Sequence, residues 1–98
     1  MPKKIFITKD LKEPAIEIDE GRKLYLTAYS EMRIQSRGIP IDYIIKTFSH
    51  PDIIMPNTNY DNARNYVRFF GDDKVKIGVK DQDEPFVLIT AFFQRIVQ

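Results

Sequence analysis

Residues 29–52, YSEMRIQSRGIPIDYIIKTFSHPD, decide the fold because they predict two consecutive helices with a short break between them. Thr27 is a suitable N-cap for the first helix, and Glu31 places an acid in its first turns, where the helix dipole favours negative charge. We expect this helix to run to about Arg37, with Gly38 as the residue that terminates it.

The second predicted helix follows the Gly-Ile-Pro break. Pro40 suits the first turn of a helix, and Pro51 ends it. Its apolar residues fall on one stripe at helical spacing: Ile41, Ile44, Ile45 and Phe48. One side of this helix is therefore expected to be buried.

The remainder of the chain predicts short strands. Before the helices, residues 4–8 and 15–19 alternate in polarity, and residues 23–26 are a third extended piece. After the helices, extended segments follow at residues 52–55, 64–70, 74–80 and 86–93. We expect an α+β fold in a single domain over residues 1–98: an N-terminal extended segment, two short helices, then an antiparallel sheet of three to four strands that takes the helices on one face.

Composition excludes several classes of protein. The 98 residues contain no cysteine, which rules out disulfides, cysteine zinc sites and a thiol nucleophile. Fifteen basic and 14 acidic side chains leave a net charge of +1, which counts against a protein that binds nucleic acid by bulk charge, although a local patch can still do so. No apolar run approaches the roughly 20 residues of a membrane span. We expect a cytoplasmic protein.

Motif spacing excludes further chemistry. A single histidine, His50, rules out a paired-histidine mechanism; we interpret it as a partner of a helix C-terminus. No phosphate-binding glycine loop and no metal-ligand spacing occurs, so we expect no cofactor and no metal. The acids Asp81, Asp83 and Glu84 lack the rest of a calcium loop and predict a solvated turn.

The first positive signal is the pair Arg33 and Arg37, four residues apart on the first helix. Side chains at this spacing lie one turn apart, and two guanidinium groups so placed can clamp a phosphate. The alternative is an ordinary solvated helix face on which Glu31 or Asp42 pairs with these arginines.

The second signal is the alternating strand segment with Arg64, Tyr66 and Arg68 on one face. Two arginines beside a tyrosine can hold phosphates and stack a base. Three lysines of the next strand extend this face if the hairpin register places them there: Lys74, Lys76 and Lys80. The alternative is an exposed sheet face with ordinary cross-strand pairs.

These residues also carry a resemblance. The order Tyr29-x-x-x-Arg33-x-x-x-Arg37-Gly38-Ile39, then His50-Pro51-Asp52, Tyr66-x-Arg68-x-Phe70 and finally Leu88-Ile89-Thr90-Ala91-Phe92 resembles a small bacterial domain family of unknown function over about residues 27–93. Its layout is similar to BrnT-like and RelE-like toxins and to toxin domains of contact-dependent inhibition effectors. Tyr29 stands where that pattern has histidine, and His50 where it has asparagine.

The resemblance implies a metal-independent endoribonuclease toxin with a curved RelE/BrnT-like sheet, neutralised by a cognate antitoxin or immunity protein. Arginines would stabilise charge on the reacting phosphate, and a tyrosine would handle protons or stack on a base. We expect catalytic roles for Tyr29, Arg33, Arg37 and Tyr66, and RNA-binding roles for Arg64, Arg68, Lys74 and Lys76.

Other functions stay open. The near-neutral charge and the missing histidine favour a non-catalytic protein-binding module of a phage or mobile element: an immunity protein, an antitoxin-like module or a degenerate toxin relative. A third hypothesis is a protein that binds nucleic acid without cutting it. Apolar residues near the C-terminus predict either a homodimer or antitoxin contact or the completion of the core: Phe92, Phe93, Ile96 and Val97.

Overall fold

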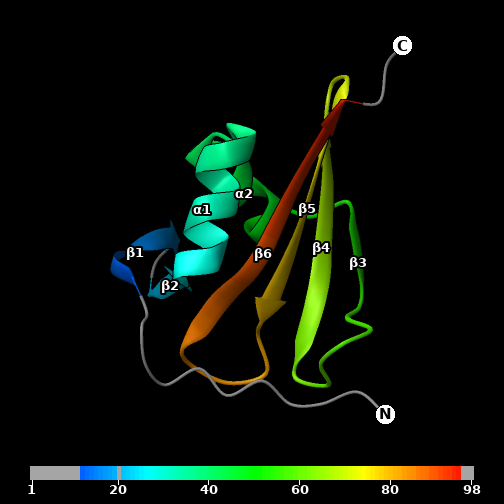
Figure 1. Cartoon of the computed structure of the whole chain (residues 1–98). Coiled ribbons are helices and arrows are strands. Elements are labelled where there is room, and N and C mark those ends of the chain that lie inside the picture. Colours follow the sequence, from blue (N-terminus) through cyan, green and yellow to red (C-terminus); the bar gives the residue numbers. More distant parts are fainter. Residues whose placement is uncertain (1–11, 20, 96–98) are drawn as a thin grey trace.

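The computed structural model describes residues 12–19 and 21–95 (Figure 1). The strand expected at residues 4–8, and Ile96 and Val97, lie outside these residues. The elements follow one another as β1 (Lys12–Asp19), β2 (Arg22–Leu26), α1 (Ala28–Arg37), α2 (Ile41–Ser49), β3 (Ile53–Pro56), β4 (Ala63–Phe70), β5 (Asp73–Lys80) and β6 (Phe86–Arg95). No helix of the described residues has the length and apolar character needed to cross a membrane.

The strands form one six-stranded mixed sheet in the order β1-β2-β6-β5-β4-β3. The expectation of a three- to four-stranded antiparallel sheet of the RelE/BrnT-like kind is wrong, although the α+β class holds. The extended segments before the helices join the sheet because β2 pairs in parallel with β6, with Leu24 opposite Phe86 and Leu26 opposite Leu88. Both leucines are buried, so this pairing adds apolar surface to the core.

Local signals set the bounds of α1. The Thr27 hydroxyl accepts a hydrogen bond from the Ser30 backbone N–H at 3.0 Å, and the Ser30 hydroxyl accepts one from the Thr27 N–H at 2.9 Å. This reciprocal cap satisfies two N–H groups that the helix itself cannot. Gly38 then ends the helix with φ 63°, a left-handed conformation that favours glycine. Both predicted ends of the helix are confirmed.

The helix α2 lies in the curve of the sheet. It packs against β1 near one end of the strand order and against β4 and β5 toward the other, so the sheet bends around it. Ile44 and Phe48 are buried, and the Phe48 ring meets Tyr66 edge-on with 4.9 Å between centroids. Ile41, which we expected on the same stripe, is 44% exposed, because it lies in the first turn of the helix at the rim of the core.

Strand register divides the sheet into two faces. Tyr66 pairs with Ile77 and Arg68 with Val75, and these residues point to the face that packs on the helices, called the covered face. The opposite, open face carries three rows of side chains across β6, β5 and β4: Gln94–Lys74–Phe69, Phe92–Lys76–Val67 and Thr90–Gly78–Asn65. Partner residues in antiparallel strands share a face, so Lys74 and Lys76 lie opposite the face of Arg64, Tyr66 and Arg68.

Candidate nucleic-acid interface

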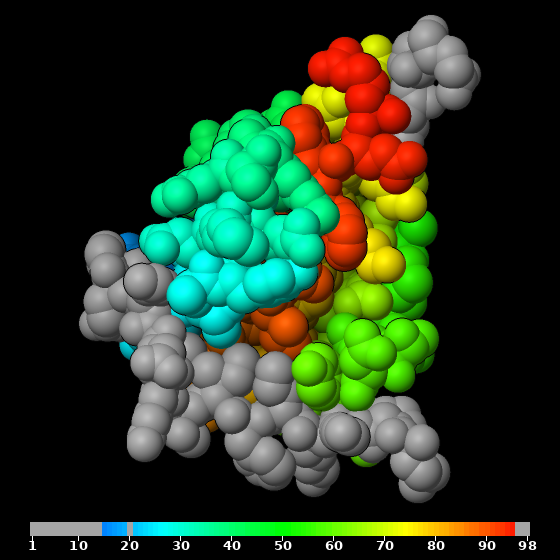
Figure 2. All heavy atoms as spheres, in the orientation of Figure 1, coloured from blue at the N-terminus to red at the C-terminus, as the bar shows by residue number. Residues whose placement is uncertain are grey.

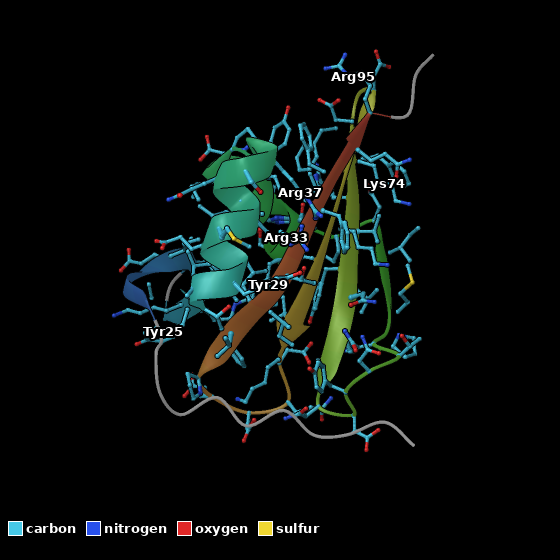
Figure 3. All side chains as sticks on the ribbon, in the orientation of Figure 1. Tyr25, Tyr29, Arg33, Arg37, Lys74 and Arg95 are labelled. Carbon is cyan, nitrogen blue, oxygen red and sulfur yellow. The ribbon has the colours of Figure 1, made fainter. Side chains whose placement is uncertain are left out.

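Tyr29, Arg33 and Arg37 form a row along the side of α1 that faces β6 (Figure 3). Arg33 Nε and Nη2 donate to the Tyr29 phenol oxygen at 2.8 and 2.6 Å, and the guanidinium carbon lies 4.8 Å from the ring centroid. Tyr29 is 48% exposed. Because the phenol oxygen accepts both bonds from Arg33, its own proton is available to an acceptor outside the pair.

Arg37 joins this row to the sheet. β6 pairs with β2 only from Phe86 to Leu88, and beyond that point α1 lies along the same edge of β6. Arg37 Nη1 donates to the Ala91 carbonyl at 2.7 Å, and its guanidinium carbon lies 4.4 Å from the centroid of the Phe92 ring. A helix cation thus reaches across the edge of β6 onto the open face.

Two lysines of β5 complete the cluster. Lys76, the cross-strand partner of Phe92 on β5, has its Nζ 5.9 Å from the Phe92 centroid. A shallow depression of about 450 Å³ lies here, lined by Arg37, Lys74, Lys76, Phe92, Phe93 and Gln94. Phe92, at its centre, is 46% exposed. In Figure 2, orange and red β6 side chains lie between cyan α1 and the green segment that includes β3.

We call these residues the α1–β6 surface: Tyr29, Arg33, Arg37, Lys74, Lys76 and Phe92. None of the ion pairs between described residues includes Arg33, Arg37, Lys74 or Lys76. The expected pairing of the helix arginines with Glu31 or Asp42 is therefore not observed; their hydrogen bonds go to a phenol and a backbone carbonyl. Three cations around the exposed Phe92 ring and a fourth on Tyr29, none with an acidic partner among the described residues, suit an anionic, aromatic ligand.

Arg64 and Tyr66 lie elsewhere, on the covered face at the end of β5. Arg64 Nε and the Tyr66 hydroxyl both donate to Asp81 Oδ2, the first at 2.8 Å, and Arg64 Nη2 lies 3.2 Å from the Tyr66 oxygen. The Asp81 side chain is only 4% exposed, which corrects the expected solvated turn at this residue. Burial and the bond to Asp81 raise the pKa of Tyr66 to about 12. This phenol keeps its proton at neutral pH.

Arg68 stabilises the end of α2. Its Nη1 donates to the His50 carbonyl at 2.5 Å, and its guanidinium carbon lies 5.3 Å from the Phe70 centroid. A cation at the carbonyl end of a helix is favourable. The His50 ring itself contacts the Ser49 hydroxyl at 3.0 Å. Arg68 is therefore placed as a helix cap, away from the α1–β6 surface.

Lys80 also leaves the predicted lysine row. It is buried, and its Nζ donates to the carbonyls of Asp83 and Pro85 at 3.0 and 2.8 Å. A register shift after Gly78 lies between Lys80 and the other two lysines. Lys80 thus holds the β5–β6 turn.

The structure brings together five of the eight residues that we expected in the site: Tyr29, Arg33, Arg37, Lys74 and Lys76. Sequence reasoning missed Phe92, which it assigned to the core or to a dimer contact. The alternation of β6 contains the signal, because Phe92 shares its face with Thr90 and Gln94 whereas Ala91 and Phe93 face the helices. No cluster of three or more potential metal-ligating side chains occurs within the described residues.

Comparison of the chain with models of protein families, with curated proteins and with solved structures finds no match in any of the three. The resemblance to ribonuclease toxins stays a prediction.

Proposed function

We propose that this protein is a metal-independent endoribonuclease that binds single-stranded RNA on the α1–β6 surface. The observation that supports the proposal is the convergence of Arg37, Lys74 and Lys76 around the exposed ring of Phe92, beside the Tyr29–Arg33 pair. Cations hold phosphates, and an aromatic ring accepts the face of any base, so the combination suits an unpaired strand better than a duplex.

The proposed reaction is a transfer within the RNA. The ribose 2′-oxygen attacks the adjacent phosphorus, the P–O2′ bond forms and the P–O5′ bond breaks, leaving a 2′,3′-cyclic phosphate and a 5′-hydroxyl. The 2′-OH proton passes to solvent or a base on the RNA, and Tyr29 donates a proton to the departing O5′. Arg33 and Arg37 stabilise the charge that develops on the phosphorane oxygens.

An endoribonuclease with a small, open surface site can cut the RNA of the cell that makes it and is then harmful to that cell. The proposed biological role is therefore a toxin of a toxin–antitoxin or toxin–immunity pair, which acts in the cytoplasm. The proposed neutralising protein is one with an acidic surface, because the α1–β6 surface presents four cations without acidic partners among the described residues.

A second candidate is a non-catalytic binding module with the same surface. It is favoured by the position of Tyr66, which is sequestered with Arg64 and Asp81 on the covered face and whose pKa is raised to about 12. Tyr29 is then the only tyrosine on the α1–β6 surface to move a proton. A ligand would be bound there without being cut.

The test is incubation of the purified protein with single-stranded RNA labelled at either end, in the presence of a metal chelator. We expect fragments with cyclic phosphate ends, at a rate that falls about 100-fold or more in Arg37→Ala. Lys46→Ala, which removes an exposed cation of α2 away from the surface, is the matched control and should cleave like the wild type. Binding without fragments would select the non-catalytic module.

The same variants test the role in cells. Induced expression in a bacterial host should arrest growth and leave discrete fragments of total RNA, and Arg37→Ala should relieve both effects. Normal growth with intact RNA, at confirmed levels of folded protein, would contradict the toxin.

A further inference from the structure

A pair of asparagines lies on the open face directly beside the α1–β6 surface. Asn65 on β4 is the cross-strand partner of Gly78 on β5. Gly78 follows Lys76 by two residues, so the row of Asn65 lies about 7 Å from the row of Lys76 along the strand direction. Asn57, in the loop after β3, donates from Nδ2 to Asn65 Oδ1 at 3.0 Å. A strand of RNA held at Lys76 can reach this position with its next base.

The orientation of both amides follows from the backbone. Asn57 Oδ1 accepts hydrogen bonds from the N–H groups of Asn59 and Tyr60 at 2.8 and 3.0 Å. Because backbone N–H groups are donors only, that atom must be the oxygen, and the group facing Asn65 must be the NH₂. Asn65 therefore receives this bond on its oxygen and directs its own NH₂ away from Asn57.

Gly78 allows this arrangement. A Cβ at this residue would lie 3.3 Å from Asn65 Oδ1 and 3.3 Å from Thr90 Cγ2. A side chain at this position would therefore crowd the Asn65 carboxamide, which glycine leaves room for. Asn65 is partly exposed, and its side-chain hydrogen bond among the described residues is the one that its oxygen accepts from Asn57.

A free asparagine offers a donor and an acceptor to a base, and so pairs with adenine. Here Asn57 holds the Asn65 oxygen through one of its two lone pairs, so the NH₂ is the group that points away from Asn57. Uracil and guanine present a carbonyl oxygen where cytosine and adenine present an amino group. An outward-pointing NH₂ can donate to the keto oxygen of uracil or guanine, whereas at the same edge position it meets the amino group of cytosine or adenine, which is a second donor.

We propose that Asn65 determines base specificity, and that the base next to the phosphate at Lys76 is a keto base, uracil or guanine. This inference rests on the proposed binding of RNA at the α1–β6 surface. Asn57 is the positioning residue, since it acts on the base only through the orientation of Asn65.

The test uses fluorescently labelled oligouridine and oligocytidine of equal length, because these strands differ in the relevant group and share size and charge. We expect the wild type to bind oligouridine about fivefold to tenfold more tightly than oligocytidine. Asn65→Ala should bring this ratio close to one without changing the affinity for oligocytidine.

Asn57→Asp is the sharper variant. Aspartate keeps the oxygen that caps the Asn59 and Tyr60 N–H groups but replaces the NH₂ by an acceptor, so Asn65 must turn its NH₂ toward it and its oxygen outward. The preference should then invert toward oligocytidine. A gain of affinity for one strand cannot come from misfolding.

The outcomes separate the inference from the proposed function. Binding of both strands with equal affinity, lost in Arg37→Ala, would overturn the role of Asn65 and leave the RNA-binding surface standing. No binding of either strand would overturn both.

Discussion

Two arginine–tyrosine pairs of the same chemistry lie in opposite environments. Arg33 and Tyr29 bond to each other on an exposed helix, and neither contacts an acidic side chain among the described residues. Arg64 and Tyr66 share Asp81, whose side chain is 4% exposed. The first pair keeps charge and a proton available to a ligand, whereas the second uses both to stabilise the fold. A motif of arginine and tyrosine thus acquires a role only from what surrounds it.

The largest expected effect tests whether the Arg64–Tyr66–Asp81 cluster stabilises the fold. Asp81→Asn removes the charge that Arg64 and Tyr66 share, while keeping the shape of the side chain. We expect the free energy of unfolding to fall by about 2–3 kcal/mol, below the value for a fully buried pair because Arg64 is half-exposed. Urea unfolding measures this loss.

Asp72→Asn, in the exposed β4–β5 turn, is the matched control and should change stability by less than about 0.5 kcal/mol. Affinity of the folded Asp81→Asn protein for RNA should stay that of the wild type. Equal stability of the two variants would show that the Arg64–Tyr66–Asp81 cluster does not stabilise the folded state.

The next effect is a dependence on alkaline pH. The pKa of Tyr66 is raised to about 12 in the folded protein, against about 10 in the unfolded chain. The folded state therefore favours the protonated phenol, and this stabilisation is complete below pH 10 and is lost as the pH rises through about 12. We expect the wild type to lose on the order of 1–2 kcal/mol more than Tyr66→Phe over this range.

Urea unfolding of both proteins at several pH values between about 9 and 12 measures the difference. Parallel curves for the two proteins would mean that Tyr66 ionises as freely in the folded state as in the unfolded chain.

The smallest expected effect tests whether the α1–β6 surface contacts RNA phosphates. Lys76→Ala removes one cation beside Phe92 without removing a described ion pair. We expect RNA affinity to fall severalfold and the slope of log affinity against log salt to decrease by about one. Titrations between about 50 and 200 mM salt measure the slope. A slope identical to that of the wild type would place Lys76 outside the phosphate contacts.

Local sequence determined the helices and the C-terminal hairpins. Thr27 and Gly38 act within a few residues of the helix ends that they form, and Gly71, with φ 58°, lies in the predicted turn between β4 and β5. Alternation along β5 likewise placed Val75 and Ile77 in the core. Such features need only neighbouring residues, so they are readable from the chain.

Only part of the candidate site could be predicted from the sequence, for a physical reason. Arg33 and Arg37 share a helix side by their spacing alone, and alternation groups Arg64 with Tyr66 and Arg68. The packing of α2 decides which face of the sheet meets the helices. The register between β4 and β5 decides which lysines share a face with Arg64, Tyr66 and Arg68. Neither is encoded in a single segment.

The sequence by itself thus determined the α+β class, the two capped helices and the arginine row of α1. Only the tertiary structure decided that β2 pairs in parallel with β6, that Asp81 is buried against Arg64, and that Arg37 meets Lys76 across Phe92. The reason is range: caps, turns and alternation act over a few residues, whereas these contacts join segments that are far apart in the chain and form only when burial of a common core aligns them.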